Sequence, residues 1–267
     1  GQGMAFPPPV DLLPDGVHCE MSTDYHHLVL RNYLNIVKLA HLNQIEMPPI
    51  IDERIQAALE FAKFVHKPDG SIPALSDGDS RNFIDVLRQG FYLYQDQELA
   101  YIVSQGRVGK VPSTRSKLFA DSGYAILRSG WGAGNDAFGD ERYLIFDCGP
   151  LGAGNHGHLD LLSFEMAAYG KSLIVDPGRF TYHEPPADSV EPNWRVYFRG
   201  TAAHNTVQID GKEQTRYVFH KNRFKIKGPE PEYQLTHFCS GKERGHNFDR
   251  VQGVARSHEY PVVHERT

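Results

Sequence analysis

The chain has 267 residues, of which 40% are hydrophobic and 23% are charged, and its formal net charge is -5. This composition is that of a globular protein and excludes disordered and fibrous classes, while the absence of any apolar run near the roughly 20 residues of a spanning helix excludes membrane insertion. The net negative charge disfavours nucleic acid as a partner, and the length predicts two structural units, or one unit and part of another.

The first part of the chain has the apolar period of α-helices. A first helix is predicted from Ser22 to about Gln44, with Ser22 or Thr23 as its cap. The apolar residues that share its period are Tyr25, Val29, Tyr33, Ile36 and Ala40. A second helix is predicted to begin at Asp52 and to stop at residues 68–70, and a third to run from about Ser80 to Gln105. The face of the second helix consists of Ile55, Leu59, Ala62 and Val65.

The helical period ends in the polar residues 111–117, so we divide the chain into an α-helical unit, 1–112, and a β unit, 113–267. Short apolar runs at 143–146 and 173–175, and alternation over 162–168, predict strands. Residues 206–209, followed by Asp210 and Gly211, predict a strand that runs into a hairpin turn. The β unit is therefore predicted to be antiparallel, as a β-sandwich.

The segment 154–160 carries the densest group of polar side chains. Glycines flank His156 and permit close approach of a ligand, and an extended backbone would direct His156, His158 and Asp160 to the same side. This pattern suits metal binding or proton transfer. The alternative is that these are polar residues at the end of a strand.

Asp176 and His204 are two further candidates. Asp176 ends an apolar strand and His204 precedes another, so neighbouring strands can bring the two side chains together. Carboxylate and imidazole groups are suitable ligands of Zn²⁺. Aspartate before Pro-Gly is also a common turn residue, and that alternative stays open.

Three segments, taken in order, resemble the heparinase II/III-like family: Asn155 to Asp160, Leu173 to Gly178, and Trp194 to Val207. Upstream, Asp15 to His26 resembles the stretch of the family's helical domain that carries a catalytic tyrosine. The resemblance covers nearly the whole chain and is closest over residues 119–209. It implies an α+β multidomain fold, an incomplete (α/α) toroid followed by an antiparallel β-sandwich, with an active site between them.

The resemblance assigns roles residue by residue. Tyr25 matches the catalytic tyrosine and His156 the catalytic histidine. The segment matches imply that a structural divalent metal, Zn²⁺ by preference, is held by His158, Asp176 and His204, with Asp160 in support.

Asn155, Arg195 and Arg199 are the predicted substrate contacts, since a guanidinium holds a carboxylate through two hydrogen bonds. The two arginines could equally form a solvated surface pair. Tyr25 could be a core residue of its helix, and Tyr182 and Trp194 could either stack on sugar rings or fill the core.

The implied function is that of a polysaccharide lyase, which cleaves a uronate-containing acidic polysaccharide by β-elimination and leaves unsaturated oligosaccharides. The family's upstream asparagine or histidine, which neutralises the substrate carboxylate, has no counterpart here, and we expect the β-sandwich to be incomplete at its C-terminus. We therefore expect a fragment that is inactive in isolation. For a bacterial protein the family implies the periplasm or cell envelope.

Two other functions fit parts of the pattern. The spacing of His156, His158 and Asp160 resembles the His-x-His-x-Asp-His signature of metallo-β-lactamase-like hydrolases, although Leu161 replaces the last histidine and that fold alternates helices with strands. A non-catalytic carbohydrate-binding fragment is the third possibility. Loss of metal should abolish turnover in a hydrolase, whereas in a lyase it should chiefly loosen the fold.

Overall fold

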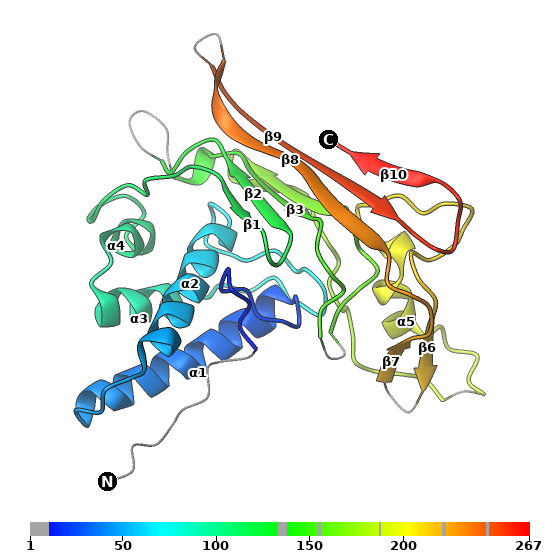
Figure 1. Cartoon of the computed structure of the whole chain (residues 1–267), viewed down its shortest axis with the longest axis horizontal. Helices are drawn as coiled ribbons and strands as arrows, with labels where there is room; N and C mark the ends of the chain where they lie inside the picture. Colours follow the sequence, from blue (N-terminus) through cyan, green and yellow to red (C-terminus); the bar gives the residue numbers. More distant parts are fainter. Residues whose placement is uncertain (1–10, 133–137, 154–155, 187, 221–222, 244–245) are drawn as a thin grey trace.

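The computed structural model describes residues 11–267, except 133–137, 154–155, 187, 221–222 and 244–245. Helices come first and antiparallel sheets follow, with one short helix among the strands, which makes an α+β fold (Figure 1). The described helices are α1 (Thr23–Leu42), α2 (Pro49–Val65), α3 (Ile84–Tyr94), α4 (Gln97–Val103) and α5 (Trp194–Arg199), with the 3-10 turns η1 (Phe138–Asp140) and η2 (Thr201–Ala203). Among these described helices, none has the length and apolar character required to span a bilayer.

The strands form three antiparallel sheets. One sheet has the order β1-β2-β3-β4-β5, a second the order β10-β9-β8, and β6 pairs with β7. The strands are β1 (Lys117–Phe119), β2 (Tyr124–Arg128), β3 (Tyr143–Asp147), β4 (Phe164–Ala168), β5 (Lys171–Ile174), β6 (Tyr217–His220), β7 (Arg223–Ile226), β8 (Glu232–Glu243), β9 (His246–Arg256) and β10 (Val263–Arg266). Figure 1 shows α1 to α4 on one side of β1 to β3 and the long β8-β9 hairpin on the other.

Strand β2 explains this layering. Tyr124 and Ile126 belong to the hydrophobic cluster that includes the helices, whereas Ala125 and Leu127 belong to the cluster shared with β8 and β9. Successive side chains of a strand point to opposite faces, so one strand supplies both cores. The larger cluster continues from the helices into the sheet across the predicted boundary at residue 112, because the apolar face of β2 and β3 needs the helices to cover it.

Helix α1 occupies the predicted range, but its buried face was predicted only in part: Ala40 is buried as expected, whereas other members of the predicted stripe are not. Leu30, Leu34 and Val37 are fully buried, while Ile36 is 46% exposed. The buried face of α1 is therefore rotated by about one residue from the predicted face. The helix carries two overlapping rows of apolar residues, and only packing against the rest of the protein decides which row is buried. Tyr25 consequently lies at the edge of the core, half-buried.

The third predicted helix is two helices. Gln95 adopts a left-handed conformation that ends α3, and the Asp96 side chain then accepts hydrogen bonds from the backbone N–H groups of Glu98 and Leu99 to start α4. Such capping restarts a helix in a new direction. A continuous apolar pattern concealed this break.

The hairpin turn at residues 209–212 is confirmed, but the strand before it is not present. Asp210 and Gly211 both have positive φ values, 53° and 66°, and the N–H of Lys212 donates to the carbonyl of Ile209. This is the conformation that Asp-Gly favours in two-residue turns. Only an isolated bridge forms there, between Ile209 and Lys212.

Three buried histidines lie where α1 meets α2. Burial lowers the pKa of His26 to about 3, that of His66 to about 4, and that of His27 well below its usual value. The His66 ring donates from Nδ1 to the carbonyl of Ala62, and the His27 ring donates in the same way to Thr23. The core of the helical unit thus contains three imidazole rings that are neutral at pH 7.

Acid should therefore destabilise the protein before its carboxylates titrate. The unfolded chain binds protons at His66 below about pH 6.5 whereas the folded chain does so only near pH 4, so the stability present above pH 6.5 is lost as pH falls through this window. Between about pH 7 and pH 5 the free energy of unfolding should fall by roughly 1 to 2 kcal/mol on account of His66. Urea unfolding at both pH values measures the fall.

The variant His66→Gln should show a smaller fall, while His41→Gln, at an exposed position of α1, should behave like the unsubstituted protein. Equal pH dependence in all three proteins would contradict the assignment.

Candidate functional site

Asp77 is the centre of the site, and sequence reasoning missed it. Its fully buried carboxylate accepts hydrogen bonds from His156 Nδ1 and His158 Nε2, both at 2.8 Å. Arg195 binds both carboxylate oxygens, and Arg199 lies 3.4 Å from one of them. Burial by itself would raise the pKa of Asp77, but the hydrogen bonds from His156, His158 and Arg195 hold it well below its ordinary value. The carboxylate therefore stays ionised.

Close backbone contacts bring these segments together. The N–H of Asp77 donates to the carbonyl of His156 at 2.9 Å. A Cβ on Gly157 would lie 1.8 Å from the carbonyl oxygen of Leu151, and one on Gly178 would lie 2.3 Å from that of Gly78. Both glycines are thus required by close approach of the backbone. These contacts press the histidine segment and the loop after β5 against the loop that carries Asp77.

Tyr25 and His156 lie face to face. Their ring centroids are 4.0 Å apart with an interplanar angle of 27°. Because His156 donates from Nδ1 to Asp77, its Nε2 carries the lone pair when the ring is neutral. That nitrogen lies 3.7 Å from a carboxylate oxygen of Glu20. The structure thus brings the two predicted catalytic residues into contact, with one imidazole nitrogen able to accept or release a proton.

Arg195 and Arg199 were predicted either to contact substrate or to form a solvated pair at a strand edge, and the second interpretation is wrong. They lie one turn apart on α5, and only 4% and 1% of their surfaces are exposed. A buried guanidinium requires a charged partner, and Asp77 is that partner. In this conformation the two arginines act on the site through Asp77 rather than by facing solvent.

A second cluster contains the candidate metal ligands. One ligand atom each from Asp160, Asp176 and His204 lies within 4.8 Å of the others, and all three residues are buried. His158 had been predicted as a ligand and Asp160 only as a supporting residue, but His158 is not a member of this group. Its ring centroid lies 5.2 Å from that of His204.

The protonation pattern of this cluster fits a cation. His204 donates from Nδ1 to Asp176, so its Nε2 carries a lone pair when the ring is neutral, and among the described residues neither this nitrogen nor Asp160 Oδ2 has a hydrogen-bond partner. Burial and the Asp176 charge raise the pKa of Asp160 to about 6. Burial opposes charge on His204 as well, yet the Asp176 carboxylate raises its pKa overall. Two buried carboxylates beside an imidazole lone pair are a suitable donor set for a divalent metal.

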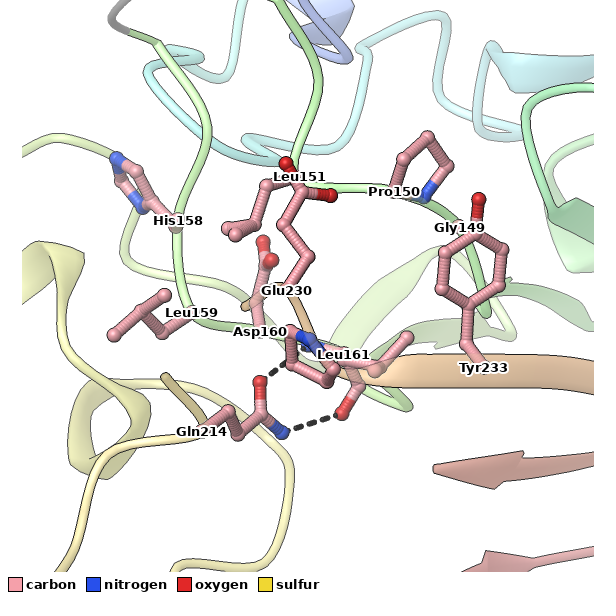
Figure 2. Close-up of a pocket in the computed structure, with 11 residues that line it drawn as sticks. Gly149, Pro150, Leu151, His158, Leu159, Asp160, Leu161, Gln214, Glu230 and Tyr233 are labelled. Atoms are coloured by element: carbon pink, nitrogen blue, oxygen red, sulfur yellow. Dashed lines mark hydrogen bonds between the residues drawn. The ribbon is translucent and has the colours of Figure 1, made fainter. Parts of the chain in front are cut away.

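The segment bearing His158 and Asp160 is held from its other side by Gln214. Figure 2 shows this segment at a pocket that Glu230 and Tyr233 also line. The Gln214 side chain accepts from the N–H of Leu161 at 3.0 Å and donates to its carbonyl at 2.9 Å (Figure 2). The side-chain amide of Gln214 therefore satisfies the backbone N–H and carbonyl groups of Leu161, as a neighbouring strand would do in a sheet.

Asn155, the remaining predicted substrate contact, lies outside the described residues. Asp77 could have been found only weakly from sequence, because it sits in Ser76-Asp77-Gly78-Asp79, a pattern typical of a solvent-exposed turn. Glu20 belongs to the segment that resembles the family's tyrosine motif, so its position next to His156 was within reach of motif reasoning.

Replacing Asp77 should destabilise the fold far more than replacing its neighbour. Asp77→Ala leaves the Arg195 guanidinium buried without its partner, which should cost about 3 to 5 kcal/mol in the free energy of unfolding. Asp79→Ala removes a carboxylate that pairs with Arg81 and Arg179 near the surface, and should cost less than about 1 kcal/mol. Urea denaturation measures both, and similar losses in the two variants would show that Asp77 is not the electrostatic centre.

Comparison with known proteins places the chain in a family. The family model "Heparinase II/III-like, C-terminal" matches residues 111–267, and "Heparinase II/III N-terminus" matches residues 9–101. Heparin-sulfate lyases of Bacteroides thetaiotaomicron and Bacteroides stercoris are 28% and 27% identical to the chain, over 77% and 78% of its length. The chain covers 31% of each of these relatives.

The fold also matches a solved structure. The heparan sulfate lyase HepC of Pedobacter heparinus superposes with a TM-score of 0.75 and 20% sequence identity, over 96% of this chain and 37% of that one. The chain thus spans about a third of the length of the relatives it matches. Since the C-terminal family model alone matches more than half of the residues, the chain belongs to the heparinase II/III-like family.

Proposed function

We propose that this chain carries the catalytic tyrosine and histidine of a lyase that cleaves a uronate-containing acidic polysaccharide, of the heparan sulfate kind, by β-elimination. The observation that carries the proposal is the stacked pair of Tyr25 and His156, with the histidine oriented by Asp77. The lyase names of the relatives support the same chemistry. The alternatives, a core role for Tyr25 and a polar strand-end role for His156, do not explain why the two rings are in contact.

The reaction removes the C5 proton of the uronate and expels the oxygen on C4, so a C4–C5 double bond forms. Tyr25, as a phenolate, takes the C5 proton and then returns a proton to the departing oxygen. His156 lies against the same ring and can relay or hold that proton at Nε2. Such positioned proton transfer contributes about 100-fold or more to a rate.

We propose that Asp160, Asp176 and His204 hold a structural divalent metal, for which Zn²⁺ is the best match of donors, and that His158 lies next to the site without binding the metal. When bound, the metal would neutralise the two buried carboxylates and brace the segment that carries His156. The buried lone pair of His204 and the unpartnered oxygen of Asp160 support this proposal.

The helices are proposed to be part of an (α/α) toroid, and the sheets part of a β-sandwich. The first proposal is supported by an apolar strip on the outer side of α1, where Ile36, Leu39 and Leu42 are 46%, 59% and 70% exposed, as expected if further helices packed there. The second is supported by the hydrophobic cluster between the two larger sheets. A hydrolase of the metallo-β-lactamase kind is disfavoured because α1 to α4 all precede the strands and only the short α5 lies among them, so helices and strands do not alternate.

The reaction is tested by incubating the full-length protein with a panel of uronate polymers and following ultraviolet absorbance, because elimination leaves a conjugated double bond. We expect absorbance to rise with heparan sulfate, and expect His156→Ala and Tyr25→Phe to slow the rise by about 100-fold or more. Tyr92→Phe, at an exposed position of α3, serves as the control. Chain shortening without a chromophore would indicate hydrolysis, and no change on any polymer would indicate a binding role.

The metal proposal is tested by thermal unfolding. Adding Zn²⁺ to the chelator-treated protein should stabilise it, by about 2.7 kcal/mol when the free metal is 100-fold above its dissociation constant. The increase should disappear in His204→Ala and persist in His183→Ala, whose histidine is exposed. An equal increase in both variants would exclude the proposed ligands.

A further inference from the structure

Tyr182 is a second phenol at the site, and the proposed reaction has not yet used it. Its hydroxyl oxygen lies 2.8 Å from that of Tyr25, a hydrogen-bond distance between residues 157 positions apart. Tyr182 is 47% exposed, so this contact is not a result of deep packing. A hydrogen bond between two phenols beside His156 therefore calls for a chemical explanation.

The Tyr182 ring is fixed by two guanidinium groups. The central carbon of Arg179 lies 4.4 Å from the ring centroid, and that of Arg195 lies 4.7 Å from it. Each arginine is itself anchored, Arg179 to Asp79 at 2.6 Å and Arg195 to Asp77. Cations held over an aromatic ring restrict its position. Arg179 and Arg195 therefore hold the Tyr182 ring so that its hydroxyl faces that of Tyr25.

These contacts connect five side chains in a closed ring. Tyr25 stacks on His156, His156 donates to Asp77, Asp77 binds Arg195, Arg195 lies over Tyr182, and Tyr182 returns to Tyr25. The five residues come from α1, the 154–160 segment, the loop before α3, α5 and the segment after β5. Displacing any one of them would loosen the geometry of the tyrosine pair.

Ionisation of Tyr25 fixes the direction of the shared hydrogen bond. Either hydroxyl can donate while both phenols are neutral, but a phenolate oxygen can only accept. Burial, followed by the hydrogen bond with Tyr25, raises the pKa of Tyr182 well above its usual value, so Tyr182 keeps its proton. The charged groups that face Tyr182 are Arg179, Arg195 and Asp77, and those that face Tyr25 are His156 and Arg81. Tyr182 is therefore the donor to a Tyr25 phenolate.

We propose that Tyr182 is the positioning residue of the reaction, donating a hydrogen bond that orients and stabilises the Tyr25 phenolate while that phenolate removes the C5 proton. The inference rests on the proposed lyase function. The Tyr182 O–H bond stays intact throughout: the proton from C5 goes to Tyr25, the C4–O bond breaks, and the Tyr25 proton passes to the leaving oxygen. Hydrogen bonds to a charged oxygen are the strong class, so the donor favours the reactive form of Tyr25.

The competing explanation is that the Tyr182 ring is a platform for a sugar, in which case the hydroxyl is incidental. The two roles separate cleanly, because Tyr182→Phe keeps the ring and removes only the donor, whereas Tyr182→Leu removes both. Tyr197→Phe is a matched control, since Tyr197 is 49% exposed and packs on Trp194 and Phe198 rather than on Tyr25.

The first experiment measures elimination kinetics in the full-length protein across pH. We expect Tyr182→Phe to lower kcat by roughly 10- to 100-fold with little change in KM, and to move the acidic limb of the kcat profile to higher pH by about one unit. Tyr182→Leu should lower kcat as much, and Tyr197→Phe should change neither. Full activity in Tyr182→Phe with loss in Tyr182→Leu would establish a sugar platform and overturn the proposal.

The second experiment does not need turnover. Nuclear magnetic resonance of ring-labelled tyrosine follows the ionisation of Tyr25, whose signal is identified by its loss in Tyr25→Phe. We expect its titration midpoint to rise in Tyr182→Phe and to stay unchanged in Tyr197→Phe, and an unchanged midpoint in Tyr182→Phe would overturn the proposal. If the unsubstituted protein released no unsaturated product from any polymer, the lyase function would fail, while this titration would still decide whether Tyr182 stabilises the phenolate.

Discussion

A single buried carboxylate, that of Asp77, organises the candidate site. Removing a carboxylate from water is expensive unless cations and hydrogen bonds replace the lost solvent, and here two imidazoles and two guanidiniums do so. The same contacts orient His156 and, through Arg195, the Tyr182 ring. The electrostatic requirement of one group thus sets the geometry of several others, which gives the site its internal rigidity.

The side chains of the candidate site come from separate layers of the fold. Helix α1 supplies Tyr25, and the hydroxyl of Thr23, two residues earlier, donates to the carbonyl of Pro73 at 2.6 Å, which ties the helix to the loop that carries Asp77. Helix α5 supplies the arginines from the other side. Because α1 to α4 and the strands β1 to β4 share one hydrophobic core, these elements cannot shift independently, and the ion pair of Arg195 with Asp77 ties α5 to them. The site is therefore built where the layers meet.

One short segment connects the candidate metal cluster with the Asp77 carboxylate. His158 reaches Asp77, and Asp160, two residues on, reaches Asp176 and His204. The two clusters thus share a stretch of backbone whose conformation is held by Gln214 and by the close contact at Gly157. A metal in this position would act on the chemistry indirectly, by holding that backbone in place.

Local patterns in the sequence determined the family, the order of helices before strands, the apolar face of α2, the turn at Asp210 and Gly211, and the candidate pair of Tyr25 and His156. These depend on near neighbours in the chain, whose spacing carries the signal. Only the tertiary structure decided which side of α1 is buried, where the third helix breaks, that Arg195 and Arg199 turn inward, and that Asp77 and Tyr182 complete the site. The reason is physical. The sequence does not show whether an aspartate or an arginine is exposed at the surface or paired inside the protein, since burial of either charge is favourable only once distant segments bring the opposite charges together.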